Sequence, residues 1–360
     1  MTTILTTTGT SLLTNTAQAL RKPFKEVTDQ ELHDYIISNS PEKVSAETNS
    51  LLKIAQKTDE IILLYTDTPD GKRCANIIYD YLQKRDWLIY SREIPIKHDE
   101  AYFERQGLRS LVDILIDEIS KAQRREQEVV INATGGFKAE IAYTTMVGMI
   151  FQVPVKYIYQ GFNQPITFPA LPVTWDTNLL LAYENFFEWI DVEPRHQVAV
   201  EKRLKPISDV ERIRAFLLQP DNDGFIYLSP AGDILWQRVR QQRQEADEAT
   251  DPPASEIPVA KKISSSLKEV KHHYPKYTLN LVEKLAALAV VEEITGGFFE
   301  NTATPRLKGV SEDGFVYMLW ADAEKGTNLT VRTTARGIAQ TLRVRDRIIR
   351  PAFEDFCKKK

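Results

Sequence analysis

Short runs of β-branched and apolar residues alternate with helical patterns along the first 160 residues. Apolar positions from Leu108 to Ile119 recur at helical spacing, which predicts a helix over 106–124. Further helices are expected at 47–57, up to about Arg85, and from Lys138 to about Phe151. Strands are expected at 2–8, 61–65, 87–91, 129–132 and 155–159. Strands that alternate with helices indicate βαβ units, a mostly parallel sheet and a Rossmann-like α/β domain over 1–176.

The pattern changes after Trp175. A linker helix at 178–190, a helix at 208–219, a short strand at 224–228 and a helix at 231–244 predict a small winged-helix-like module within 177–245. The segment 246–258 is acidic and contains prolines. It has few apolar residues to bury, so we expect an exposed linker there.

The pattern over residues 259–360 predicts an α+β domain. Apolar spacing from Leu279 to Val291 predicts helices, and Gly296-Gly297 is expected to end them. Three strands are then predicted as an antiparallel meander, at Phe315–Trp320, Asn328–Thr333 and about Ile338–Val344.

Charge divides the 360-residue chain into unlike parts. Residues 259–360 contain 18 Lys and Arg against 12 Asp and Glu, whereas the rest contains 28 against 38. A basic segment joined to an acidic one suggests that the C-terminal part meets a polyanion such as RNA. The two cysteines have no disulfide or zinc spacing, no apolar run is long enough to span a membrane, and the N-terminal run lacks the basic start of a signal peptide. We therefore expect a cytoplasmic protein with two or three domains and no metal site.

Two polar loops follow predicted parallel strands. The first is Thr8-Gly9-Thr10-Ser11, and the second runs from Asn132 through Ala133-Thr134-Gly135-Gly136-Phe137 to Lys138. Ligands of such sheets bind at the carboxyl ends of the strands, where glycines let the backbone approach a phosphate and helix N-termini supply donors. Neither loop has the spacing of a dinucleotide or nucleoside-triphosphate motif, and both could also be ordinary tight turns.

Three segments resemble the CARF domain of CRISPR-associated proteins: TTTGTSLLTN at the start, LLYTDTPDG after the second strand and NATGGFKAEIAY before a helix. The resemblance covers about residues 1–175 and implies a homodimer that binds a cyclic oligoadenylate across its two-fold axis. It implies that Ser11 and Lys138 contact the ring phosphates. The other residues that it places in or near the pocket are Thr10, Asp67, Thr68, Thr134, Gly135 and Gly136. Two-fold symmetry favours an even-membered ring, and tetra-adenylate is the expected activator.

The last part of the chain, roughly residues 265–355, resembles RelE-like ribonucleases. The features that carry the resemblance are two helices, a turn at Leu307-Lys308-Gly309, a basic meander and an arginine-rich last strand. Such enzymes need no metal, because cations surround a phosphate that the RNA's own 2′-hydroxyl attacks, and they cut mRNA in the ribosome. The residues implied as catalytic are Arg332, Arg336, Arg343, Arg345, Arg347 and Lys308, with Arg306 beside them. Alternation would place Arg343, Arg345 and Arg347 on one face of a strand. Cations that protect a strand edge are the alternative interpretation.

Taken together, the patterns predict a homodimeric CRISPR ribonuclease that is activated by tetra-adenylate, with mRNA and the ribosome as partners. Two other functions stay open. A transcriptional regulator would bind DNA through the 200–245 module, with Arg238, Arg240 and Arg243. A ring nuclease would cleave tetra-adenylate itself, with Ser11 and Lys138 at the reacting phosphate.

Overall fold

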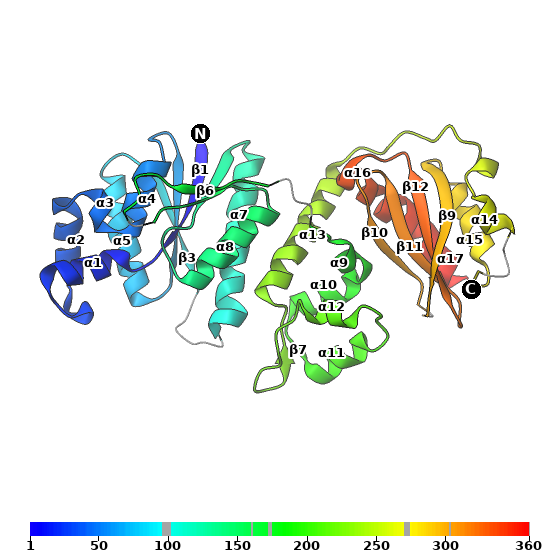
Figure 1. Ribbon diagram of the computed structural model, residues 1–360, viewed down its shortest axis with the longest axis horizontal. Helices are drawn as coiled ribbons and strands as arrows, with labels where there is room; N and C mark the ends of the chain where they lie inside the picture. Colours follow the sequence, from blue (N-terminus) through cyan, green and yellow to red (C-terminus); the bar gives the residue numbers. More distant parts are fainter. Residues whose placement is uncertain (96–101, 160, 172–174, 270–273, 302–303, 360) are drawn as a thin grey trace. The chain divides into compact units, whose positions relative to one another are not determined.

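The computed structural model describes residues 1–95, 102–159, 161–171, 175–269, 274–301 and 304–359. The chain divides into two compact units (Figure 1). Unit 1 comprises residues 1–175 and 229–234, and unit 2 comprises residues 176–228 and 235–360.

Unit 1 is an α/β unit in which helices alternate with parallel strands. Its elements are β1 (Thr2–Thr8), α1 (Ser11–Leu20), η1 (Phe24–Glu26), α2 (Asp29–Ser38), α3 (Pro41–Val44), α4 (Ala46–Ile54), β2 (Glu60–Thr66), α5 (Pro69–Gln83), β3 (Leu88–Ile94), η2 (Phe103–Gly107), α7 (Leu108–Arg124), β4 (Glu128–Asn132), α8 (Lys138–Ile150), β5 (Val155–Tyr157) and β6 (Ile166–Phe168).

The six-stranded sheet of unit 1 has the order β3-β2-β1-β4-β5-β6. The first five strands run parallel to their neighbours, and β6 pairs antiparallel with β5 at the edge. The predicted Rossmann-like sheet is therefore confirmed. Because β1 lies between β2 and β4, the winding of the chain reverses between β1 and β4. Ligands of open α/β sheets bind outside the carboxyl ends of the strands at such a reversal.

Burial of β1 explains why the sheet forms where the apolar runs predicted it. Residues 3–8 of this strand are all buried, and Ile4 joins one apolar cluster with side chains of α1, α2, α4 and α5. Helices α7 and α8, which follow β3 and β4 in the chain, pack against each other, and α7 contacts β1, β3 and β4 (Figure 1). A parallel sheet that is covered on both faces needs apolar side chains in both directions, which is why its strands read as continuous apolar runs.

Unit 2 is built around an antiparallel sheet. Its elements are α9 (Asn178–Ala182), α10 (Glu184–Val192), β7 (Arg195–His196), α11 (Gln197–Leu204), α12 (Val210–Arg214), β8 (Phe225–Ile226), α13 (Pro230–Glu248, whose first residues fall in the 229–234 segment), η3 (Val259–Lys261), α14 (Ser265–Glu269), α15 (Thr278–Ala286), β9 (Val291–Glu300), β10 (Arg306–Val310), β11 (Phe315–Ala321), β12 (Gly326–Thr333), α16 (Gly337–Arg343), η5 (Val344–Ile349) and α17 (Arg350–Lys358).

One apolar core holds unit 2 together. The main sheet has the order β10-β11-β12-β9, with antiparallel pairing throughout, and β7 pairs with β8 in a separate two-stranded sheet. A single cluster of buried side chains runs from Leu179 to Phe356. Trp236 of α13 is fully buried in it and stacks on Phe187 of α10, with ring centroids 5.7 Å apart. The segments predicted as a separate module and a C-terminal domain thus share one core, and the winged-helix-like character of the first stays a prediction.

Two glycine-containing segments differ from the sequence-based predictions. Gly296 and Gly297 lie inside β9 rather than at a helix end, and Leu307-Lys308-Gly309 belongs to β10 rather than to a turn. The physical reason is close approach of another side chain. A Cβ atom at Gly296 would lie 2.6 Å from the Tyr274 hydroxyl, and one at Gly309 would lie 1.7 Å from Asn178 Oδ1. A glycine in a strand often marks such an approach rather than a break.

The prediction of a third meander strand at about Ile338–Val344 is wrong. Residues 337–343 form α16 and continue through η5 into α17. Leu342, Ile349, Phe353 and Phe356 are buried at helical spacing. The strand is predicted from residues 338–344 alone, and the helical period becomes visible only when the residues up to Phe356 are included. The predicted linker also differs, because α13 extends to Glu248 and Pro252 is buried.

Candidate functional site

The loops after β1 and β4 meet at the reversal point of the unit 1 sheet. The Thr7 hydroxyl at the end of β1 donates to the Gly135 carbonyl at 2.6 Å. A Cβ atom at Gly9 would lie 2.9 Å from the Gly136 backbone nitrogen. The two loops therefore pack backbone against backbone, which only glycines allow at this distance. The structure thus brings together the loops that contain Thr10, Ser11 and the 134–138 segment.

A buried carboxylate lies between these loops. Glu47, the second residue of α4, is fully buried. Its carboxylate accepts hydrogen bonds from Gly9 N–H at 2.8 Å and from the Ser11 hydroxyl at 2.7 Å. The Ser11 hydroxyl also accepts from Ala46 N–H at 2.9 Å. Two of the donors expected to hold a phosphate are therefore engaged by a side chain of the protein itself.

The sequence contains no signal that singles out Glu47. An acidic residue in the first turn of a helix is common, because it interacts favourably with the helix dipole. Only the folded chain shows that this carboxylate reaches the β1 loop.

The remaining predicted ligand residues have different surroundings. Lys138 is exposed at the first position of α8, and the described residues offer its ammonium group no ion pair. Thr10 is the N-cap residue of α1 and forms no side-chain capping bond. The Thr134 hydroxyl donates to Asn132 Oδ1 at 2.7 Å and accepts from Ile158 N–H at 3.1 Å. Lys138 and Thr10 are thus available to a ligand, whereas Thr134 stabilises the loop.

Asp67 and Thr68 lie in the loop after β2, the neighbour of β1 on the side away from β4. Thr68 is buried, and its hydroxyl caps α5 by accepting from Gly71 N–H at 3.1 Å. Asp67 is half-buried, and its backbone N–H donates to the Ile94 carbonyl at 3.0 Å. The Thr68 side chain is engaged in helix capping, so the Asp67 side chain is the one of the two that can face a ligand.

Unsatisfied polar atoms gather around the same loops. The Thr6 and Thr8 hydroxyls of β1 and Glu140 Oε1 and the Thr144 hydroxyl of α8 are buried without a hydrogen-bond partner. Glu140 Oε2 accepts from Phe137 N–H at 3.0 Å, which completes the first turn of α8. Burial raises the pKa of Glu140 to about 7, and the bond from Phe137 only partly opposes this. Buried polar groups without partners are uncommon, and a ligand or an ordered water molecule is their usual complement.

The predicted catalytic arginines of the last strand are instead on helices. Arg343 ends α16, and Arg345 and Arg347 lie in η5. Arg343 pairs with Asp251 at 2.5 Å and Arg347 with Asp247 at 2.7 Å. The expected common face of three guanidinium groups on a strand does not exist, because a helix places these positions at about 200° intervals rather than on one side.

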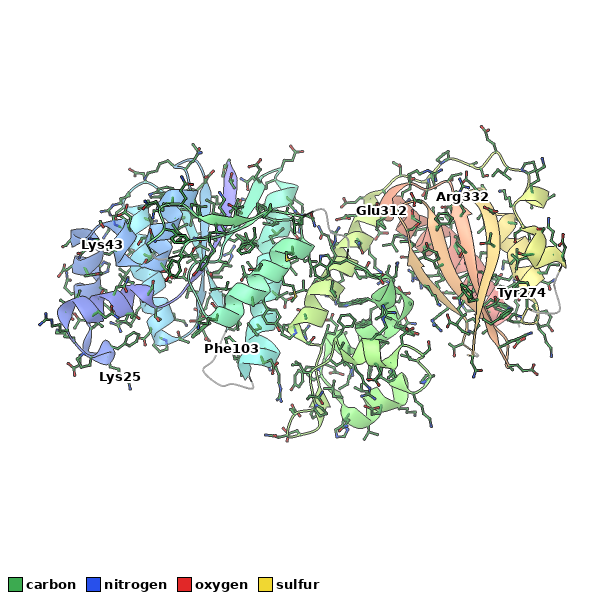
Figure 2. The ribbon with its side chains drawn as sticks, in the orientation of Figure 1. Lys25, Lys43, Phe103, Tyr274, Glu312 and Arg332 are labelled. Carbon is green, nitrogen blue, oxygen red and sulfur yellow. The ribbon has the colours of Figure 1, made fainter. Side chains whose placement is uncertain are left out.

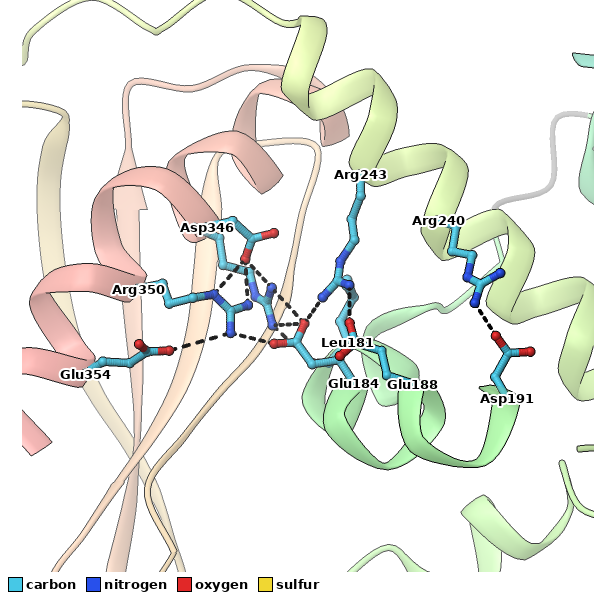
Figure 3. A network of polar contacts seen from close by, with 10 residues as sticks. Leu181, Glu184, Glu188, Asp191, Arg240, Arg243, Asp346, Arg350 and Glu354 are labelled. Atoms are coloured by element: carbon cyan, nitrogen blue, oxygen red, sulfur yellow. Dashed lines mark hydrogen bonds and ion pairs between the residues drawn. The ribbon is translucent and has the colours of Figure 1, made fainter. Parts of the chain in front are cut away.

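Arg345 belongs to a buried ion-pair network. Figure 3 labels its partners Glu184 and Asp346. Its side chain is fully buried, with Nε donating to the Lys308 carbonyl at 2.7 Å and Nη2 to the Leu181 carbonyl at 3.0 Å. Its guanidinium group also pairs with Glu184 at 3.4 Å and with Asp346 at 2.5 Å. A side chain held in this way would have to leave these partners to reach an RNA phosphate, so its contacts favour a structural role for Arg345 over the predicted catalytic one.

The other members of the network join the same helices. Glu184 of α10 also pairs with Arg350 of α17, at 2.5 Å, and with Arg243 of α13. Burial alone would raise the pKa of Glu184, but Arg345 and Arg350 lower it below its usual value. Removing one member of such a network leaves buried charge or buried carbonyls without a partner.

Arg332 is the most accessible of the predicted catalytic cations on the sheet. It lies on β12 (Figure 2), its side chain is 48% exposed, and it pairs with Glu292 at 3.3 Å. Arg336 instead donates to the carbonyls of Thr333 and Ala335, at 3.1 and 2.7 Å.

Lys308 and Arg306 share the carboxylate of Glu300, at 2.5 and 3.2 Å. The structure therefore does not bring the predicted RelE-like cations together around one empty space. Arg332 and the Lys308–Arg306 pair are the members that stay at the sheet surface.

The arginines of α13 are paired within unit 2. Arg238 contacts Glu245 at 3.3 Å, Arg240 pairs with Asp191, and Arg243 pairs with Glu188 at 2.8 Å as well as with Glu184. A DNA backbone would have to displace these carboxylates.

A cavity lies elsewhere in unit 2. It has a volume of about 790 Å³ and is bounded by α10, α11, β10 and α17. Trp189 is in its wall, with the Arg203 guanidinium 4.1 Å from the ring centroid. None of the predicted catalytic residues other than Arg306 lines it.

Two kinds of feature are absent from the described ranges. No group of three or more His, Cys, Asp and Glu side chains is placed to hold a metal ion there. None of the helices in those ranges combines the length and apolar character that a membrane crossing requires.

Comparison with known proteins gives one family match. Residues 42–171 match the model of the CRISPR-associated protein family Cas_APE2256. The chain also resembles protein VC1899 from Vibrio cholerae, with 9% identity, coverage of 92% of this chain and 77% of that one, and a TM-score of 0.27. A further similar structure is Can2 from Sulfobacillus thermosulfidooxidans in complex with cyclic tetra-adenylate, with 11% identity, coverage of 89% and 77%, and a TM-score of 0.24. The family match supports the resemblance to CRISPR-associated proteins over residues 42–171.

Proposed function

We propose that this protein is a CRISPR-associated sensor that binds a cyclic oligoadenylate, with tetra-adenylate as the expected ring, at the reversal point of the unit 1 sheet. The observation that carries the proposal is the meeting of the β1 and β4 loops, where glycine backbone and hydroxyl groups lie close together and the exposed Lys138 follows at the start of α8. Helices α1 and α8 both begin there, so their N-terminal N–H groups favour an anion. The family match over residues 42–171 supports the same assignment.

A homodimer is part of this proposal, because a ring with two-fold symmetry is matched by two copies of one site. The sheet edge at β6 supports it. Tyr159, Phe162, Ile166, Phe168 and Leu171 are large apolar residues that are all exposed along this edge. Exposed apolar side chains at the free edge of a sheet are typical of an interface, and a second copy of the chain is the occupant that we propose.

Calorimetric titration with cyclic tri-, tetra- and hexa-adenylate tests the sensor. We expect the wild-type protein to bind tetra-adenylate and Lys138→Ala to bind it about tenfold or more weakly, since a charge-assisted hydrogen bond contributes about 1.5–3 kcal/mol. Lys25→Ala is the matched control, because Lys25 is also exposed but lies beyond the far end of α1 from Ser11 (Figure 2). Absence of binding heat with every ring would refute the proposal.

We further propose that unit 2 is the effector, a metal-independent ribonuclease that cuts mRNA with the ribosome as a partner. Its support is the excess of basic residues in 259–360 and the exposed Arg332 on β12, with Lys308 and Arg306 on β10. In this chemistry a 2′-hydroxyl of the RNA attacks the adjacent phosphorus and the 5′-oxygen leaves, while cations stabilise the charge on the phosphate.

A translation extract tests the effector and separates it from the alternatives. Addition of tetra-adenylate should cause mRNA cleavage with wild-type protein, and both Lys138→Ala and Arg332→Ala should reduce it. Loss of tetra-adenylate without RNA cleavage would replace the ribonuclease with a ring nuclease. Retention of duplex DNA in a gel shift, without cleavage, would favour the transcriptional regulator.

A further inference from the structure

Glu47 is an anion that already lies in the proposed phosphate position. Its carboxylate receives the Gly9 N–H and the Ser11 hydroxyl, at 2.8 and 2.7 Å, and its side chain has no solvent exposure. The described part of the chain gives its carboxylate no ion pair, so the neutral donors of the β1 loop are what stabilise it. A phosphate oxygen would need the same two donors.

The space around the carboxylate is shaped by glycine. A Cβ atom at Gly135 would lie 2.3 Å from Glu47 Oε1, and one at Gly9 would lie 3.8 Å from the same oxygen. The β4 loop therefore packs on one side of the carboxylate and the β1 loop on another. Each side chain added at these positions would reduce the room that an anion occupies, which is the usual reason for glycine at a phosphate-binding loop.

The carboxylate is connected to α4 at its first turn. Ser45 is the N-cap of α4 and exchanges hydrogen bonds with Thr48, while the Ser11 hydroxyl accepts from Ala46 N–H. At the other end of α4, Lys53 donates to the Phe162 carbonyl at 3.2 Å, next to the exposed apolar edge. Release of Glu47 from the β1 loop would therefore free the first turn of α4, a helix that contacts the ligand loop at one end and the proposed dimer surface at the other.

We infer that Glu47 is an internal competitor of the ligand, and that a phosphodiester group of the cyclic oligoadenylate binds by replacing its carboxylate at Gly9 N–H and the Ser11 hydroxyl. This inference rests on the proposed sensor function. Two anions cannot share these donors, because like charges in contact repel strongly where water is excluded. The competitor therefore sets the affinity of the site and keeps it closed to weakly bound anions.

Glu47→Gln is the test, because glutamine keeps the shape and one acceptor but not the charge. A hydrogen bond to a charged acceptor is stronger than one to a neutral amide, so we expect Glu47→Gln to bind tetra-adenylate about tenfold more tightly than the wild type. Glu26→Gln is the control, since it makes the same charge change at an exposed position beyond the other end of α1. Its affinity should equal that of the wild type.

Calorimetry with tetra-adenylate distinguishes the outcomes. If the wild type binds and Glu47→Gln binds equally or more weakly, the competitor role is refuted while the sensor function stands. If neither protein binds any ring, both the competitor role of Glu47 and the sensor function are refuted. Should Glu47→Gln fail to fold, as judged by its thermal melt, Glu47→Asp takes its place. Its side chain is one methylene shorter and cannot reach both donors, so it should also bind more tightly than the wild type, and equal or weaker binding would overturn the inference.

Discussion

Replacement of Arg345 by alanine should destabilise unit 2 rather than remove a catalytic group. The side chain is fully buried, and it joins three segments that are distant in sequence: the α9–α10 region through Leu181 and Glu184, β10 through the Lys308 carbonyl, and its own helical segment through Asp346. Figure 3 shows these segments converging on the network.

The size of the effect follows from the contacts that are lost. Two backbone carbonyls, of Leu181 and Lys308, would be left without this donor, at a cost of about 1–3 kcal/mol each. Glu184 would keep Arg243 and Arg350, so its charge would not be left entirely unpaired. We therefore expect a loss of about 3–5 kcal/mol in the free energy of unfolding, the range typical of a broken buried ion pair.

Urea denaturation followed by tryptophan fluorescence measures this loss. Trp236 is fully buried in the core of unit 2 and reports its unfolding. With a slope of about 2 kcal/mol per molar urea, the transition of unit 2 should move to lower urea by roughly 2 M. Arg332→Ala is the control, because its half-exposed side chain makes a surface ion pair that is worth about 0–1 kcal/mol.

A midpoint for Arg345→Ala that equals the midpoint for Arg332→Ala would refute the structural role. Loss of RNA cleavage in a fully folded Arg345→Ala protein would do the same, and would return this arginine to the catalytic set.

Two further predictions concern the site loop and the sheet of unit 2. The pKa of Glu140 is raised to about 7 from 4.5, so the folded state keeps a proton that the unfolded chain releases between these pH values, and stability falls as pH rises through this window. Glu140→Gln should abolish this loss of stability with rising pH. Compared with the wild type, its free energy of unfolding should be higher by up to about 3 kcal/mol at pH 8 and little changed at pH 4, as measured by urea midpoints. If the variant shows the same pH dependence as the wild type, the raised pKa of Glu140 is contradicted. Gly309→Ala should cost about 1–3 kcal/mol, because its Cβ would overlap Asn178 Oδ1, the acceptor of Val310 N–H at 2.9 Å. Gly297→Ala, where the nearest atom is 3.4 Å away, should melt near the wild-type temperature, and equal melting of both variants would show that Asn178 moves freely.

The parallel sheet of unit 1 could be predicted because its signals are local. Each strand is a short apolar run, and the loops after β1 and β4 contain the glycines that the chain needs at its reversal point. Parallel strands in βαβ units have their carboxyl ends at the same edge of the sheet, so the amino-acid sequence alone is enough to assign Ser11 and Lys138 to one edge.

The site itself could not be completed from the sequence, because its most important contact is not local. Glu47 lies 36 residues from Ser11, in a different helix, and looks like an ordinary helix-start residue. The same limit explains the error at Arg345. Alternating arginines suggest a strand, but the residues that decide the structure are Glu184, 161 positions earlier, and the apolar positions up to Phe356.

The continuous core of unit 2 restricts how this chain can be recombined with others. A cut at residue 258 would separate Trp236 and Phe187 from the apolar side chains of β9–β12, with which they form one cluster. A gene fusion that joins unit 2 to another domain therefore has to start near residue 176, where unit 2 begins, and has to include α9–α13.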